Sequence, residues 1–137
     1  MSGLFDKTSQ ALGSSINMRL LRQNVTTGNI ANAETPGYKA KKVDFEEALA
    51  RAVDLDGTSK LGIDHDEHFL TGGGSISKVR ADVYDNPEGN TTNDGNTVDL
   101  EKEMATLAEN SILYKAAIRL INKKLAQMRY AATEGSR

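Results

Sequence analysis

The residues with the clearest chemical potential lie between His65 and His68, where two imidazoles flank two carboxylates. Imidazole nitrogens and carboxylate oxygens bind zinc, but a zinc-binding helix places its histidines four residues apart, whereas these are three apart. No third ligand set with a familiar spacing accompanies them, and the surrounding sequence is typical of a loop. A solvated polar turn is therefore the preferred interpretation, and no metal site is predicted.

The other candidates for chemistry are weaker. The glycine run Thr71-Gly72-Gly73-Gly74-Ser75 lacks the lysine and the following helix that a phosphate-binding loop requires. A nucleophilic triad cannot be built from two histidines and no cysteine, and Glu46-Glu47 shows no sign of burial. The sequence therefore predicts no catalytic residue, no cofactor-binding residue and no enzyme.

Charge and hydropathy exclude two classes of partner. The formal net charge is -2, which gives no drive toward nucleic acid. A cluster of basic residues near the C-terminus is interpreted as a solvated helix end. Its members are Lys115, Arg119, Lys123, Lys124 and Arg129. No apolar run approaches membrane-spanning length, and the N-terminus lacks the pattern of a secretory signal, so neither membrane insertion nor a cleaved signal is expected.

The last forty residues carry the strongest structural pattern. Large apolar residues recur there with alternating spacings of four and three, which predicts one long helix with an apolar seam along its length. This predicted assembly seam consists of Leu100, Met104, Leu107, Tyr114, Ile118, Ile121, Leu125 and Met128. Acidic residues follow a capping segment at 97–99, which favours a helix start there. Such a helix is built to pack lengthwise against others.

The same helix has a second apolar face roughly opposite the seam, formed by Ile112, Leu113 and Leu120. A helix of a two-helix hairpin needs only one apolar face. Because a 137-residue chain with 38% hydrophobic and 5% aromatic residues does not favour a large core, we expect other chains to cover this second contact face.

The N-terminal segment, from about residue 4 to 33, is predicted to be helical with two apolar stripes. Phe5, Leu12, Ile16, Leu20 and Ile30 form one stripe, and Leu4, Ala11, Met18 and Val25 form the other. Pro36 moves the preceding residue out of the helical region, and Gly37 favours a turn with positive φ. The first helix should therefore end before this turn.

The middle of the chain is thin and rich in turn signals. Residues 41–53 predict a few amphipathic helical turns, and only Lys78 to Tyr84 alternates like a strand. The fold class is thus mainly α: long terminal helices packed as a coiled-coil-like pair, with an irregular, partly β central segment. We divide the chain into an N-terminal helix (1–34), a signature turn with the central segment (35–96) and a C-terminal heptad helix (97–137).

Two segments are similar to a known family. NIANAETPGYKAKKVDF, residues 29–45, closely resembles the signature of the bacterial flagellar rod and hook proteins. The matching signature positions are Asn29, Ile30, Ala31, Asn32, Thr35, Pro36, Gly37 and Tyr38. DGNTVDLEKEM, residues 94–104, resembles the C-terminal block of the proximal rod members. Its matching positions, with two later ones, are Asn96, Val98, Leu100, Met104, Asn110 and Tyr114.

The resemblance implies a structural subunit that self-assembles through its terminal helices into the torque-transmitting shaft of the basal body, in the periplasmic space. It implies export through the flagellar type III apparatus without a cleaved signal, and no cofactor. The implied partners are other copies of the chain, other rod proteins and the junction protein between rotor ring and export gate at the rod base.

Alternatives remain open at this point. A sister proximal rod protein of similar size shares the signature turn. An autonomous helical adaptor or export chaperone would use the same two helices, and a small hydrolase or metal enzyme would have to be built on the central segment around His65 and His68.

Overall fold

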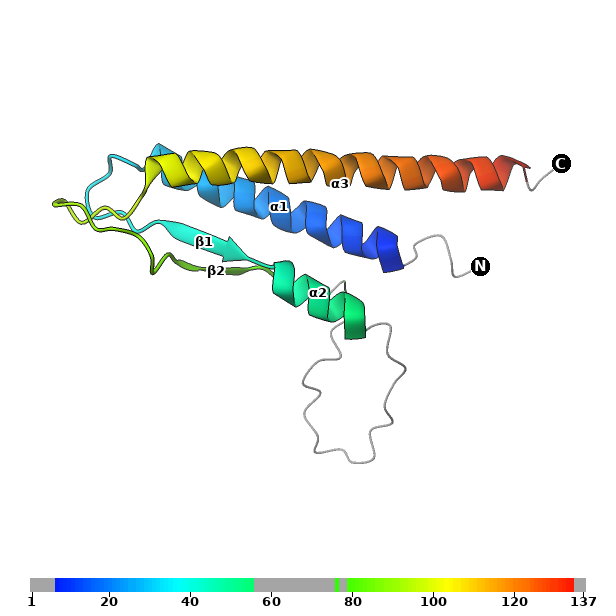
Figure 1. Cartoon of the computed structure of the whole chain (residues 1–137), viewed down its shortest axis with the longest axis horizontal. Helices are drawn as coiled ribbons and strands as arrows, with labels where there is room; N and C mark the ends of the chain where they lie inside the picture. The colour runs from blue at the N-terminus through cyan, green and yellow to red at the C-terminus, as the bar shows by residue number, and fades with distance from the viewer. Residues whose placement is uncertain (1–6, 56–75, 77–78, 135–137) are drawn as a thin grey trace, which may run out of the picture.

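The computed structural model describes residues 7–55, 76 and 79–134 of the chain. It contains helix α1 (Lys7–Ala31), strand β1 (Lys41–Asp44), helix α2 (Glu46–Leu55), strand β2 (Asp82–Asp85) and helix α3 (Leu100–Glu134). The chain is mainly helical, with its two long helices in contact and a small sheet and a short helix between them in sequence. The predicted fold class is confirmed (Figure 1).

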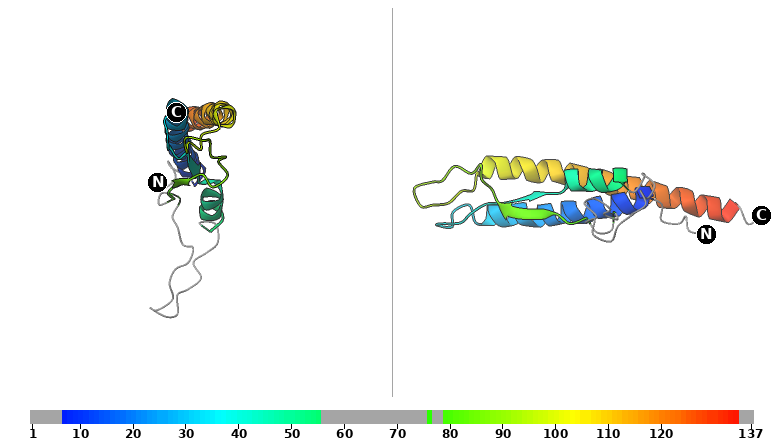
Figure 2. Two further views of the ribbon diagram at one scale, coloured as in Figure 1. Left: turned by 90° about the vertical axis from the view of Figure 1, so that its left-hand side faces the viewer. Right: turned by 90° about the horizontal axis from the view of Figure 1, so that it is seen from below.

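Helices α1 and α3 lie side by side along the long axis of the molecule (Figures 1 and 2). Helix α1 has 25 residues and α3 has 35, so at 1.5 Å per residue α3 is longer by about 15 Å. Its C-terminal part continues beyond the start of α1. Asp99 Oδ1 accepts a hydrogen bond from the Lys102 amide at 3.2 Å, which caps the first turn of α3.

Strands β1 and β2 form a two-stranded antiparallel sheet, in which Lys41 pairs with Asp85 and Asp44 with Asp82. The prediction of helical turns from residue 41 is wrong for its first part, because residues 41–44 pair with β2 and the helix begins only at Glu46. The strand predicted at 78–84 is confirmed only in part, because β2 begins at Asp82 and residues 79–81 lie outside it. Val83, predicted to share one side of the strand with Val79 and Ala81, is 42% exposed. In β1, pairing with the distant strand β2 overrides the local helical pattern.

The buried interior is small and mixed. Its apolar members are Ala40, Val43, Phe45, Ala52, Ile76 and Ala117. Among the residues that the structure describes, an equal number of buried residues are polar: Ser9, Thr26, Asn29, Asn96, Thr97 and Asn110. Buried polar groups need hydrogen-bond partners, so specific polar contacts, besides apolar packing, must join the elements.

Several sequence features fall outside the described residues, among them His65 to His68, the glycine run at 71–75, and Leu4 and Phe5. Within the described ranges, no helix has the length and apolar character needed to cross a membrane. No group of three potential metal ligands occurs within those same ranges.

Candidate assembly site

Asn29, near the C-terminal end of α1, is completely buried, and both the nitrogen and the oxygen of its side-chain amide are hydrogen-bonded. Its Nδ2 donates to the Lys41 carbonyl at 2.7 Å and to Glu103 Oε2 at 3.0 Å. Its Oδ1 accepts from the Lys41 amide at 3.0 Å and from the Tyr38 hydroxyl at 3.3 Å. Because an amide has two donors and two acceptor sites, Asn29 is fully satisfied and joins α1, β1 and α3.

The turn after α1 is built from local hydrogen bonds. Asn32 Nδ2 donates back to the Gly28 carbonyl at 2.8 Å, and its Oδ1 accepts from the Thr35 hydroxyl at 3.0 Å. Gly37 has a φ of 73°, the left-handed region that favours glycine, and its amide donates to the Asp94 carbonyl at 2.9 Å. The signature residues therefore end the helix and turn the chain toward the segment that precedes α3.

Asn96 closes the connection from the other side and is only 2% exposed. Its Nδ2 lies 2.8 to 3.0 Å from the carbonyl oxygens of Asn32, Ala33 and Thr35, so its two hydrogens are shared among three acceptors. Its Oδ1 accepts from the Val98 amide at 2.7 Å. One side chain thus satisfies carbonyls left free at the end of α1 and orders the approach to α3.

Thr97 completes the same cluster. Its amide donates to the Tyr38 carbonyl at 3.0 Å, and its hydroxyl accepts from the Ala40 amide at 2.9 Å. This polar clasp consists of Asn29, Tyr38, Asn96, Thr97 and Glu103. The clasp joins the two motifs that the sequence analysis singled out, which are about sixty residues apart in the chain.

A second connection joins α1 to the sheet and α2. The Arg22 guanidinium donates to the Val43 carbonyl at 3.0 and 2.6 Å and forms a two-point ion pair with Glu46. It also lies over the Phe45 ring, 4.6 Å from the centroid. Although partial burial acts to raise it, the pKa of Glu46 lies below its usual value because of hydrogen bonds from Arg22 and backbone amides.

Arg19 approaches the same Phe45 ring at 5.4 Å, and burial lowers the pKa of its guanidinium. Its carbonyl accepts from Asn110 Nδ2 at 2.8 Å across the contact between α1 and α3. Asn110 is 2% exposed, and no atom of the described residues hydrogen-bonds its Oδ1 or Arg19 Nη1. Sequence reasoning missed the cluster of Arg19, Arg22, Phe45 and Glu46, since no local spacing relates these residues.

The predicted assembly seam is only partly directed at α1. Leu107, Tyr114, Ile118, Ile121 and Met128 are half-buried. Leu100, Met104 and Leu125 are exposed instead. The positions of α3 that are fully buried are Asn110 and Ala117, which the seam did not include. At 100° per residue these two lie beside the seam, because a single neighbouring helix covers a narrow line of α3.

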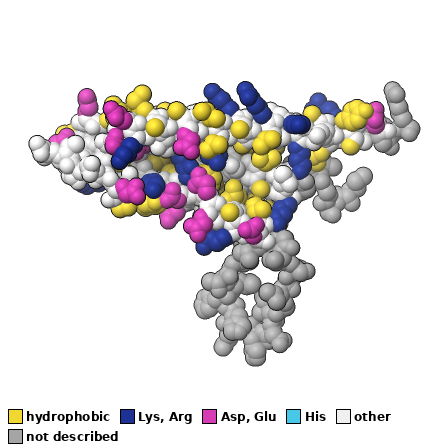
Figure 3. All heavy atoms as spheres, viewed as in Figure 1, with side chains coloured by type: hydrophobic (Ala, Val, Ile, Leu, Met, Phe, Trp, Pro, Cys, Tyr) yellow, Lys and Arg dark blue, Asp and Glu magenta, His cyan; other side chains and the backbone are white. Residues whose placement is uncertain are grey.

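The second contact face is open to solvent. Ile112 is 68% exposed and Leu120 55%, and Leu113 is exposed as well. On α1, Leu12, Ile16, Met18, Val25 and Ile30 are half-buried and Leu20 is exposed, whereas the fully buried positions are Ser9, Thr26 and Asn29. The space-filling view shows apolar side chains along the visible face of the long helices (Figure 3).

Part of the sequence matches a known protein family. Residues 10–39, which span most of α1 and the turn after it, match the family model described as "Flagella basal body rod protein". The matched description is that of a structural rod protein and not of an enzyme.

Individual relatives narrow the class. The chain is 33% identical to the flagellar basal body rod protein FlgB of Aeromonas hydrophila, over 89% of each chain. It is 34% identical to FlgB of Bacillus subtilis strain 168, over 96% of this chain and 98% of that protein. Against FlgB of Escherichia coli K12 the identity is 28%, over 97% and 100%. The chain belongs to the flagellar basal body rod protein FlgB family.

Proposed function

We propose that this chain builds the proximal rod by packing the outer face of α3 against neighbouring subunits. The observation that carries the proposal is the pair of faces on α3. One side is held against α1 through Asn110 and Ala117, and the opposite side presents Ile112, Leu120 and Tyr130 to solvent. A monomer seldom leaves a line of large apolar side chains uncovered, so neighbours in the shaft are the natural cover.

The polar clasp supports this role by fixing how α1 and α3 lie relative to each other. A shaft transmits torque only if its subunits resist shear, and closely packed helices have low compressibility. The directional hydrogen bonds of Asn29 and Asn96 hold the helix ends in one register, as a buried asparagine does in a coiled coil. Each subunit therefore offers its neighbours a rigid surface.

The proposed partners are other copies of the chain, other rod proteins and the junction protein between rotor ring and export gate at the rod base. The proposed route is the flagellar type III apparatus, with no cleaved signal, to the periplasmic space. Membership in the rod family and the small, half-polar interior support this route, because a chain with a modest core unfolds readily for passage.

The test replaces Ile112 with aspartate in a strain whose own copy of the gene is deleted. Ile112 is 68% exposed, so Ile112→Asp should leave the circular dichroism of the isolated chain unchanged while placing a charge in the contact between subunits. We expect non-motile cells whose envelope retains the rings but lacks the shaft. Asn90→Asp adds the same charge at an exposed loop residue and serves as the matched control. Normal motility of Ile112→Asp would refute the proposal.

A further inference from the structure

Charge is segregated along this molecule. Residues 79–109 contain eight Asp and Glu against two Lys and Arg, whereas residues 110–133 contain five Lys and Arg and no acidic residue. The first group occupies β2, the loop after it and the start of α3, and the second lies along the rest of α3 (Figure 1). The chain is therefore acidic toward one end and basic toward the other, although its net charge is only -2.

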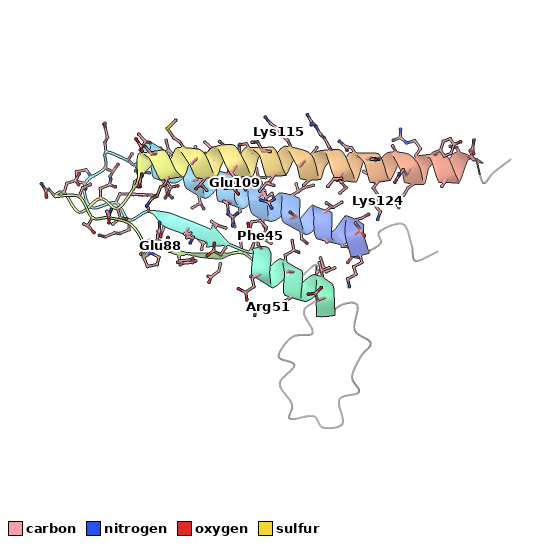
Figure 4. The ribbon with its side chains drawn as sticks, viewed as in Figure 1. Phe45, Arg51, Glu88, Glu109, Lys115 and Lys124 are labelled. Atoms are coloured by element: carbon pink, nitrogen blue, oxygen red, sulfur yellow. The ribbon has the colours of Figure 1, made fainter. Side chains whose placement is uncertain are left out.

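The basic residues form an ordered stripe on the face of α3 that points away from α1. Ile112, Arg119 and Lys123 lie within about 20° of one line at 100° per residue, and Lys115 flanks them. Figure 4 shows Lys115 on the outer edge of the molecule. No salt bridge joins Lys115, Arg119 or Lys123 to another described residue. The stripe spans about 12 Å, from eight residues at 1.5 Å each.

The acidic residues include an unusual pair in the sheet. The register places Asp82 directly opposite Asp44, and like charges facing each other across two strands destabilise the pairing. Asp82 and the nearby Glu88 are exposed and have no ion-pair partner among the described residues. Figure 4 shows Glu88 on the edge of the molecule opposite to that of Lys115. Asp44 already has a cation within the chain, since Arg22 lies 4.0 Å from its Oδ1, and it accepts a hydrogen bond from the Tyr84 hydroxyl. A cation from outside the chain would therefore act on Asp82 and Glu88.

From these observations we infer that a second copy of this chain supplies that cation. The sheet surface of one copy, with Asp82 and Glu88, docks on the α3 stripe of the next copy, with Lys115, Arg119 and Lys123. The two surfaces lie on opposite sides of the molecule, so the contact is heterologous and repeats in one direction instead of closing as a symmetric dimer. The inference rests on the proposed function and adds to it which face meets which.

The contact predicts salt-dependent association of the purified full chain. Screening shortens the range of exposed charges to about 8 Å at physiological ionic strength and to about 3 Å at 1 M. In sedimentation velocity we expect oligomers in 20 mM NaCl and monomers in 1 M NaCl. Monomers under both conditions, or oligomers that persist at 1 M, would overturn the inference.

Neutralising each surface separately tests the direction of the contact. The acidic-side variant is Asp82→Asn with Glu88→Gln, and the basic-side variant is Arg119→Gln with Lys123→Gln. Each variant alone should associate at least tenfold more weakly than the wild type at low salt. An equimolar mixture should give dimers and nothing larger, since only one intact contact can form between the two variants.

The outcomes separate this contact from other arrangements. Wild-type-like association of either variant, or mixtures that remain monomeric, would contradict it, and so would dimers formed by one variant alone. Asp82→Asn removes the repulsion from Asp44, so the acidic-side variant should unfold at a temperature no lower than the wild type, and misfolding of that variant cannot explain its weaker association. If both variants swim normally while Ile112→Asp does not, the proposed function stands and this contact is wrong.

Discussion

Exchanging the buried amide of Asn29 for a carboxylate should destabilise the chain in a way that depends on pH. In Asn29→Asp the donor to Glu103 is lost, and two carboxylates face each other at the 3.0 Å that now separates Nδ2 from Oε2. Two like charges at that distance repel by about 5 kcal/mol at an effective dielectric constant of about 20. Water reaching the half-buried Glu103 reduces this figure, so we expect a loss of about 3 kcal/mol at pH 7.

The sign of the pH dependence follows from the same contact. Burial and the neighbouring Glu103 raise the pKa of the introduced aspartate in the folded chain above its unfolded value of about 3.9. The neutral form is therefore favoured by folding. The stability lost at pH 7 should return as the pH falls toward 4, where the protonated carboxyl can donate to Glu103.

The assay is urea unfolding followed by circular dichroism at 222 nm, with the wild type measured at each pH. The difference in unfolding free energy between Asn29→Asp and wild type should shrink by at least about 1 kcal/mol between pH 7 and pH 4.5. A pKa shift of less than one unit in the introduced aspartate would be enough to produce this change. Adding Glu103→Gln should recover part of the loss at pH 7, because the glutamine amide can donate to the new carboxylate. Wild-type stability of Asn29→Asp at pH 7, or an equal loss at both pH values, would refute the reasoning.

Three other predictions concern single contacts elsewhere in the fold. Gly89→Ala should lose about 1–3 kcal/mol of unfolding free energy, because the added Cβ would lie 2.7 Å from the Thr97 carbonyl oxygen. Gly13→Ala, which has open space within α1, should instead gain about 0.5–1 kcal/mol of unfolding free energy. Equal effects of the two substitutions in denaturant titrations would contradict this. Arg22→Lys should lower the unfolding free energy by about 1–2 kcal/mol, since lysine cannot reproduce the two-point contact with Glu46. The difference in unfolding free energy from wild type should diminish as the pH falls and Glu46 becomes protonated. A loss that stays constant down to pH 3 would rule this out. The hydrogen bond to Asp44 raises the pKa of Tyr84 to about 12. The contribution of this hydrogen bond to stability is therefore complete below pH 10 and is lost as the pH rises through 12. In a titration followed by absorbance at 295 nm, the wild type should show a tyrosine ionising near pH 12, and Tyr84→Phe should lack that step.

The long helices were predictable because their patterns extend over many residues. The 4-3 spacing after Leu100 and the break at Pro36 define two helices whose ends lie within a few residues of those observed. Strand β1 was not predictable, since four residues carry too little periodicity and its partner lies about forty residues away. Local pattern reports the neighbours of a residue along the chain and says little about its neighbours in space.

The candidate site shows the same limit. Asn29 appeared in the sequence only as a matching motif position in a weakly helical segment, yet it is fully buried and satisfies four hydrogen bonds. The cluster of Arg22 with Phe45 and Glu46 brings together two segments with no shared spacing. For α3, the apolar pattern indicated which residues could pack, but only the position of α1 shows that Leu100, Met104 and Leu125 remain uncovered.

Chemical accessibility of α3 in the assembled rod tests the central claim most directly. The chain has no cysteine, so a single Ile112→Cys substitution gives one reactive thiol on the outer face. The rate of maleimide labelling is measured in the isolated chain and in purified basal bodies. We predict rapid labelling of the isolated chain and labelling at least tenfold slower in the assembled rod. Equal rates in the two states would show that the outer face of α3 is not an assembly surface.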